Sequence, residues 1–170
     1  MNLQPFHQWF VLLHILGVLG LLLAHGASVA VAFRLRSERD PIRIKALLEL
    51  SNAYLNAMYG GLLVLLLFGI LAGISGAFWT SGKLWIWAAL VVLVGIVVGM
   101  YLVALPFFNN VRHAVGLATF DDVRKGLQPP EPVSASDLET LLASSAPMTT
   151  ALTGVGGLAI IAWLMVLKPF

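Results

Sequence analysis

Residues 9–33 read WFVLLHILGVLGLLLAHGASVAVAF, an apolar run with no charged residue. A transmembrane helix needs about 20 consecutive apolar residues, because the hydrocarbon core of a bilayer is about 30 Å thick. The run carries His14 and His25, and His7 lies just before it. At about 100° per residue, these spacings place the three imidazoles within roughly 20° of one line on a helix. The stretch therefore predicts a membrane-spanning helix with a histidine stripe.

The composition indicates that the whole chain belongs in a membrane. Hydrophobic residues make up 59% of its 170 residues and charged residues only 11%, whereas soluble domains have about 25% charged residues. Runs long enough to span a bilayer lie at residues 9–33, 54–78, 84–108 and 148–167, with a loop at 109–147. These runs predict a single all-α domain, residues 1–170, that forms an integral membrane four-helix transmembrane bundle.

The basic residues predict which way the bundle faces. Lys and Arg favour the cytoplasmic side in short loops. Of the 10 basic residues, Lys83 and Lys168 lie in the second loop and at the C-terminus, and all the others fall in the first and third loops. We therefore expect up-down-up-down spans with both termini outside and residues 109–147 in the cytoplasm. The tryptophans all fall at the ends that this topology places outside, which suits their preference for the headgroup region.

Local signals predict the helices that border the first and third loops. Asp40 followed by Pro41 is typical of an N-cap and a first helical residue, so the second helix should start before the membrane. In the third loop we expect two short helices around a proline-containing linker. The first covers residues 119–127, and the second begins with a capping box of Ser136 and Glu139.

Glycines mark the faces where neighbouring helices should approach closely. Small residues allow backbones to come together in a membrane, where lipid provides no hydrophobic force between helices. The glycines that we expect at helix contacts are Gly17, Gly20, Gly69, Gly73, Gly95 and Gly99. Pro106, beyond the last of them, removes a backbone donor and should end or kink the third helix near the inner face.

His14 and His25 are the candidate functional residues, because ionisable groups inside the hydrocarbon are costly and usually have a partner or a use. In one interpretation they are axial ligands of haem b or ligands of copper. In the other, each is a packed imidazole bonded to a backbone carbonyl, to an Asn or, for His25, to Tyr101. The chain has no cysteine, so a metal would need His, Met, Asn or carboxylate ligands.

Two further arrangements concern the same histidines. In a parallel two-fold dimer about the membrane normal, His14 would face its own copy at equal depth and could share a haem with it. Asn52, Asn56 and Tyr59 recur at three or four residues and form a polar stripe that enters the inner leaflet. The stripe is either a path for an ion or proton from His25 or ordinary contact between helices, worth about 0.6 kcal/mol per contact.

The pattern LHILGVLGLLLAHG at residues 13–26, the basic loop RLRSERDP at residues 34–41 and the four-helix layout resemble an uncharacterised family of bacterial four-helix integral membrane proteins. That family is similar in turn to the membrane domain of CopD-type copper-resistance proteins. His14 with Gly17 and His25 with Gly26 match motif-like positions. The resemblance implies a bacterial cytoplasmic (inner) membrane location and keeps copper and haem among the candidate ligands. The chain departs from copper handling in having no Met-rich or Cys-containing site.

These observations leave three classes of function open. The first is a haem- or metal-binding membrane protein in electron transfer or metal handling. The second is a structural or accessory subunit that packs against other membrane proteins or against its own copies in a homo-oligomer. The third is a small transporter, against which the lack of carboxylates within the spans counts. We expect the lipid bilayer as a partner, no nucleic acid, and no enzymatic activity, since no nucleophile with a base can be placed.

Overall fold

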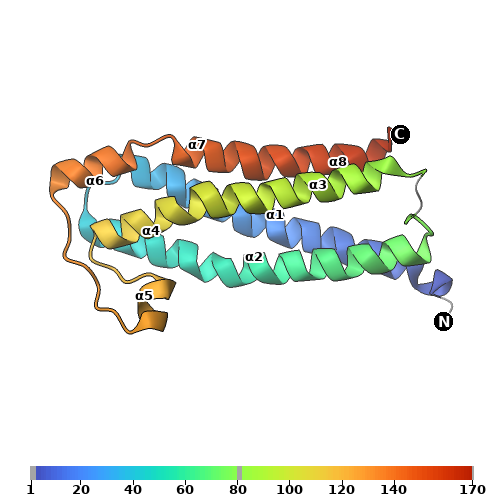
Figure 1. The fold of residues 1–170 in the computed structure, drawn as a ribbon, viewed down its shortest axis with the longest axis horizontal. Helices are drawn as coiled ribbons and strands as arrows, with labels where there is room; N and C mark the ends of the chain where they lie inside the picture. The colour runs from blue at the N-terminus through green and yellow to red at the C-terminus, as the bar shows by residue number, and fades with distance from the viewer. Residues whose placement is uncertain (1–2, 80–81, 170) are drawn as a thin grey trace.

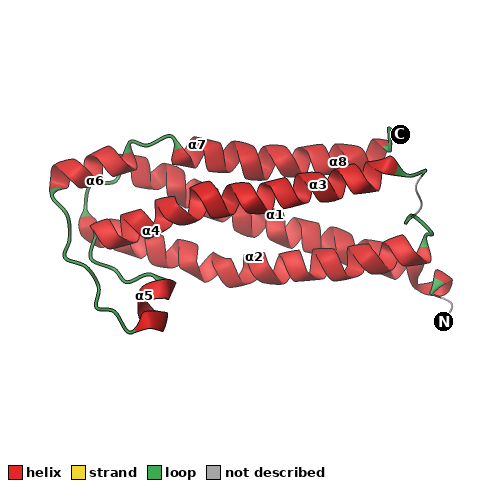
Figure 2. Cartoon of the chain, in the orientation of Figure 1, coloured by secondary structure: helices red, strands yellow, loops and turns green. Residues whose placement is uncertain are grey.

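The computed structural model of the protein describes residues 3–79 and 82–169. These residues form helices and loops with no strand among them (Figure 2), which confirms the all-α prediction. Four helical stretches are long and apolar enough to cross a membrane, namely Gln4–Ser37, Pro41–Ser75, Leu84–Ala114 and Ala135–Leu167. They run along one long axis, and the two ends of the chain lie at the same end of the bundle (Figure 1).

Each stretch contains one or more helical elements. The first consists of a 3₁₀ turn, η1 (Gln4–Phe6), and α1 (His7–Ser37), and the second is α2 (Pro41–Ser75). The third consists of α3 (Leu84–Gly99), η2 (Met100–Ala104) and α4 (Leu105–Ala114). Two short helices follow, α5 (Phe120–Lys125) and α6 (Ala135–Leu142). The fourth stretch begins with α6 and continues through α7 (Ala146–Ala151), η3 (Leu152–Gly156) and α8 (Gly157–Leu167).

The segments η2 and η3 are single turns of π-helix within otherwise α-helical spans. A π-bulge places one extra residue in the helix and shifts the local hydrogen bonds to residues five apart. The segment η2 ends two residues before Pro106, which has no backbone N–H to donate. Because the helix continues past this proline to Ala114, Pro106 does not end it.

The helices α1 and α2 meet backbone to backbone at two glycines. A Cβ on Gly17 would lie 2.5 Å from the backbone nitrogen of Leu65, and a Cβ on Gly61 would lie 2.7 Å from that of Leu21. A step of four residues along α1 is therefore matched by a step of four residues back along α2. Only residues without a side chain permit this approach of two antiparallel helices.

The other predicted contact glycines divide into two groups. Gly69, Gly73 and Gly99 pack against the side chains of His14, Trp79 and Thr153 respectively. Around Gly20 and Gly95 no atom comes within 4 Å of where a Cβ would lie. A side chain at either position would therefore meet open space, although the backbone carbon of Gly20 lies at the α1–α2 contact, 3.2 Å from where a Cβ on Gly61 would be. Gly61, whose partner is the backbone of Leu21, was not among the glycines predicted at helix contacts.

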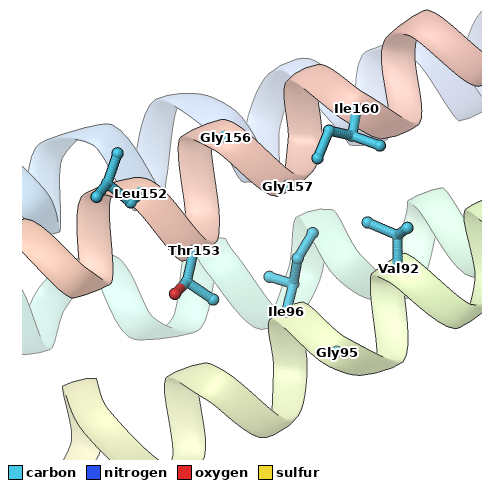
Figure 3. A pocket seen from close by; sticks show the side chains of 8 residues that line it. All are labelled: Val92, Gly95, Ile96, Leu152, Thr153, Gly156, Gly157 and Ile160. Atoms are coloured by element: carbon cyan, nitrogen blue, oxygen red, sulfur yellow. The ribbon is translucent and has the colours of Figure 1, made fainter.

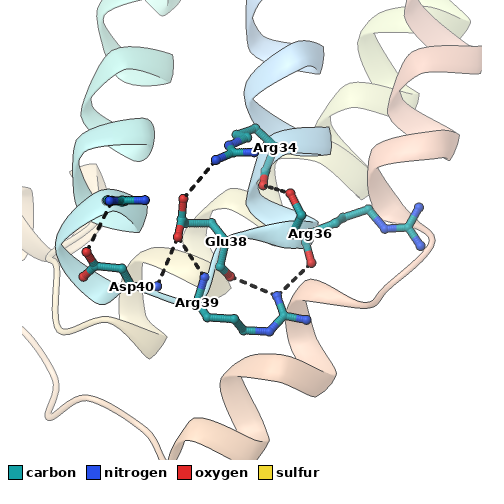
Figure 4. A network of polar contacts seen from close by, with 7 residues as sticks. Arg34, Arg36, Glu38, Arg39 and Asp40 are labelled. Carbon is teal, nitrogen blue, oxygen red and sulfur yellow. Dashed lines mark hydrogen bonds and ion pairs between the residues drawn. The ribbon is translucent and has the colours of Figure 1, made fainter.

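Polar contacts close the turn between α1 and α2 (Figure 4). The Glu38 carboxylate accepts hydrogen bonds from the backbone N–H groups of Arg39 at 3.1 Å and Asp40 at 3.3 Å, and it pairs with Arg34 at 3.4 Å. The two N–H groups hold the pKa of Glu38 below its usual range. Asp40 in turn accepts from the backbone of Ile42 at 2.9 Å. This contact confirms the predicted N-cap of the second helix.

The largest apolar core lies at the end of the bundle away from the termini (Figure 1). It joins the last turns of α1, the first turns of α2, α4 and α6, and its fully buried members include Leu35, Ile44, Val111 and Leu142. Ion pairs between Arg112 and Glu49 and between Arg39 and Glu139, each 3.0 Å long, lie around this core. Deeper in the bundle the buried cluster is smaller and consists of Leu21, Leu65 and Leu158.

The predicted start of α6 is wrong by two residues. Ser134, and not Ser136, is the N-cap, and its hydroxyl accepts from the backbone of Asp137 at 3.2 Å. Both serines precede an acidic residue by three positions, so the local pattern fits either one. The choice is made by tertiary structure, because the N–H of Val133 donates to the carbonyl of Ala114 at 3.0 Å and fixes the linker just before the helix.

Gly17→Ala should destabilise the bundle, because its Cβ would press on the backbone of Leu65, and overpacking of this kind costs about 1–3 kcal/mol. The midpoint of denaturation in mild detergent, followed by far-UV circular dichroism, measures the effect. Gly20→Ala is the matched control, since its Cβ enters open space and alanine favours a helix by up to about 1 kcal/mol. Equal midpoints for the two variants would contradict the role of this backbone contact.

Candidate functional site

His14 is held on α2 by a hydrogen bond to the backbone. Its Nδ1 lies 2.8 Å from the carbonyl oxygen of Leu65. Since a carbonyl only accepts, Nδ1 carries a proton, and in the neutral form of the ring Nε2 then has the free lone pair. Gly69, one turn after Leu65, makes room for the ring, because a Cβ there would lie 2.8 Å from Nδ1. The ring is thus packed and oriented, with one nitrogen left to bind a ligand.

His7 makes a similar contact at the end of the bundle that carries the termini. Its Nδ1 lies 2.8 Å from the hydroxyl oxygen of Ser75. That hydroxyl donates to the carbonyl of Ala72 at 3.2 Å, so its oxygen accepts from His7. The His7 ring also packs edge-on against Phe78, with 5.8 Å between the centroids. These contacts fasten the start of α1 to the end of α2.

His25 faces the fourth stretch instead of α2. Its side chain is buried, with 5% of the residue exposed, and it lies against Gly154 in η3, where any side chain would overlap Nε2. The backbone of Thr150 lies near the ring, yet Nε2 makes no hydrogen bond within the part of the chain that the structure describes. Gly154 is therefore what allows an imidazole to enter the contact between α1 and η3.

The stripe of histidines does not form one binding site. His14 and His25 are separated by about 16 Å along α1, at about 1.5 Å per residue, and they contact different helices. The two imidazoles of one chain therefore cannot coordinate the same ion. Across residues 3–79 and 82–169, no three His, Asp or Glu side chains gather in a group that could hold a metal ion.

The expected supporting residues lie on the outer surface of the bundle. Tyr101, Asn52, Asn56 and Tyr59 are all exposed. The structure does not bring Tyr101 to His25, and it does not bring the polar stripe of α2 there either. What lies beside the histidines is a backbone carbonyl for His14 and a glycine for His25. Neither kind of partner has a sequence pattern that would pair it with a histidine on another helix.

The fourth histidine ties α5 to α4. His113 Nε2 lies 2.6 Å from Oδ2 of Asp122, which also accepts from the Thr119 N–H at 2.8 Å and from its hydroxyl at 2.6 Å. The Thr119 hydroxyl and then His113 hold the pKa of Asp122 well below its usual range. His113, Thr119 and Asp122 are named the latch below.

An open apolar groove runs between α3 and the fourth stretch (Figure 3). Its volume is about 390 Å³, and it is lined by Val92, Gly95, Ile96, Leu152, Thr153, Gly156, Gly157 and Ile160. Thr153 supplies the one hydroxyl among these side chains. The groove is a surface that a lipid chain or another helix can fill.

These features define the class of the protein, an all-helical protein with four helices long and apolar enough to cross a membrane. No family model, curated protein or solved structure matches the chain.

Acid should release α5 from α4. Because the pKa of Asp122 is lowered in the folded state, its stabilising contribution is complete above the ordinary carboxyl pKa of about 3.9 and is lost as the pH falls below that value. A nitroxide label at Lys125→Cys should therefore become mobile in acid. With Asp122→Asn it should be mobile already at pH ~7, where the carboxylate is otherwise ionised, whereas with the control Asp121→Asn it should not. A label that stays immobile with Asp122→Asn would contradict the latch.

Gly154→Ala should displace the His25 ring, because any Cβ there overlaps Nε2, and the overpacking should cost about 1–3 kcal/mol. Removing the imidazole should cancel part of this cost. A double-mutant cycle of Gly154→Ala with His25→Ala, read from denaturation midpoints, should give a coupling of about 0.5–3 kcal/mol. Gly156→Ala, whose Cβ meets open space, should show no coupling with His25→Ala. Additive effects at Gly154 would argue against the contact.

Proposed function

We propose that the chain is a multi-pass protein of the bacterial cytoplasmic membrane that binds haem b through His14 and takes part in electron transfer, without being an enzyme. The observation that carries the proposal is the hydrogen bond from His14 Nδ1 to the Leu65 carbonyl. Ligating histidines usually donate their other ring N–H to a carbonyl or carboxylate, which fixes the tautomer and the ring orientation. His14 has this arrangement, and its Nε2 is left to bind.

The donor set fits haem better than copper. A haem needs only one or two axial ligands from the protein, whereas a copper ion bound by the protein alone needs several converging ligands. His14 is the one histidine available at its position, since His25 is too distant to share a ligand with it. The ring is half-buried, and Leu12, Ile15 and Leu16 beside it are exposed. A haem plane would have apolar side chains to rest on there, and bound haem supplies a one-electron redox centre.

His25 suits ligation less well. Its Nε2 lies against the backbone of Gly154, so an iron atom could reach it only if η3 moved away. We therefore assign the ligand role to His14 and a packing role to His25. Copper remains a second ligand for His14, because the sequence resembles CopD-type membrane domains.

The proposed topology is up-down-up-down with both termini outside. Its support is the distribution of the basic residues, which favour cytoplasmic loops. Eight of the 10 basic residues lie in the last turns of α1, the turn to α2, the first turns of α2, the end of α4 and α5. All these segments lie at the end of the bundle away from the termini (Figure 1).

His14→Ala should abolish the Soret band of the protein purified in mild detergent, because it removes the axial ligand. His25→Ala and the control His7→Ala should keep the band, and oxidised and reduced spectra of all four proteins make the comparison. Elemental analysis of the same samples reports copper. Parent protein that contains neither haem nor copper, or a band that survives in His14→Ala, would overturn the proposal.

A second function, that of an accessory subunit, is favoured by the outer face of α2. Asn52 and Asn56 are exposed there, and amide groups that meet lipid lack hydrogen-bond partners unless another helix supplies them. The open groove of Figure 3 offers a further surface for a neighbouring helix. Isolation of a cofactor-free protein together with partner membrane proteins, or as a homo-oligomer, would favour this function over haem binding.

A further inference from the structure

The short helix α5 carries an apolar face that nothing in the described chain covers. Phe120 is 82% exposed, Val123 69% and Leu127 56%. At about 100° per residue Phe120 and Val123 lie about 60° apart around α5, and Leu127 follows directly after the turn at Gly126 that ends the helix. None of the three belongs to either apolar core. Apolar side chains gathered on one exposed face mark an interaction surface.

This face is presented by a well-defined element, although α5 is short. At its start, Thr119 and Asp122 form a capping box. At its end, Gly126 has a φ of +67°, and the N–H of Leu127 donates to the carbonyl of Asp122 at 2.9 Å. The N–H of Gly126 donates to the carbonyl of Val123 at 3.2 Å, which completes a Schellman motif. Both ends are closed by hydrogen bonds, so Leu127 stays attached to the helix.

The latch determines which way the face points. Asp122, which bonds to His113 of α4, lies about 160° around the helix from Phe120 and about 100° from Val123. The latch side faces the bundle, and the apolar side turns away from α4. Figure 1 shows α5 beside the bundle, at the level of α4 along the long axis, and not beyond its end.

We propose that α5 is an interfacial anchor that inserts Phe120, Val123 and Leu127 into the headgroup region of the bilayer. The partner is the membrane that the four spans cross. α4 completes the third span, and α5 is tied to α4 at the same level, so the apolar face reaches the membrane surface without a change of fold. An apolar face of this kind lies in the plane of the interface.

The charges of α5 indicate how this anchor binds. Arg124 pairs with Asp121 at 3.0 Å. Lys125 makes no ion pair with any residue in the described ranges, and at about 100° per residue it lies about 160° around the helix from Val123, opposite the apolar face. Insertion therefore depends on the apolar side chains. The anchor does not rest on haem binding and holds for either proposed function.

The chain has no cysteine, so nitroxide labels can be placed one at a time in the full-length protein. Phe120→Cys and Val123→Cys sample the apolar face, and Asp121→Cys and Lys125→Cys are neighbouring controls. In vesicles of phosphatidylcholine and phosphatidylglycerol, labels at 120 and 123 should collide more with membrane-dissolved oxygen than with a water-soluble nickel chelate. The order should reverse at 121 and 125. Val123→Asp should return the label at 120 to water.

Two outcomes would overturn the anchor. Equal access of the nickel chelate to all four positions would mean that the face stays in water. Protection of positions 120 and 123 from both reagents would mean that a protein, either a second copy or another partner, covers them. Circular dichroism of each variant shows whether the helices are intact, and vesicles of phosphatidylcholine alone should give the same order of collisions, because the insertion depends on the apolar side chains.

Discussion

The backbone contact between α1 and α2 sets the position of the histidines. Lipid does not press apolar helices together, so helices in a membrane are held by close packing of small residues and by hydrogen bonds. Leu65 takes part in both interactions, because Gly17 packs on its backbone nitrogen and His14 bonds to its carbonyl oxygen. Leu65 therefore determines both the approach of the two helices and the orientation of the imidazole. A change that separates the helices also releases the ring.

The two ends of the bundle are stabilised by different forces. At the end of the bundle away from the termini, the large core around Leu35 and Leu142 buries apolar side chains that would otherwise be exposed to water. Hydrogen bonds at Glu38 and Asp40 fix the turn between α1 and α2 there. In the middle of the bundle, the buried cluster is small and the glycines bring backbones together. The difference follows from the two solvents, water at the bundle's end and lipid around its middle, since the hydrophobic effect operates only where water is displaced.

The sequence predicts what is encoded locally. The four long apolar helices, the Asp40 cap and the contact of α1 at Gly17 all follow from composition, spacing and turn chemistry. The partners of the histidines could not be found in this way. His14 bonds to a backbone carbonyl, which every residue has, and His25 lies on a glycine that only the folded bundle brings near. The choice of Ser134 over Ser136 likewise depends on a bond from Val133 to Ala114, far away in the chain.

The π-bulge η3 determines how α8 is rotated about the helix axis relative to α7. One additional residue turns the helix beyond it by about 100°. Gly154 meets His25 in α1, and Gly157 meets Ile96 in α3, with the bulge in place. Loss of one residue between the two glycines would keep at most one of these contacts. The fold therefore requires the length of this segment more strictly than the identity of its outward-facing side chains, and a chain one residue shorter here would have to pack its fourth helix differently.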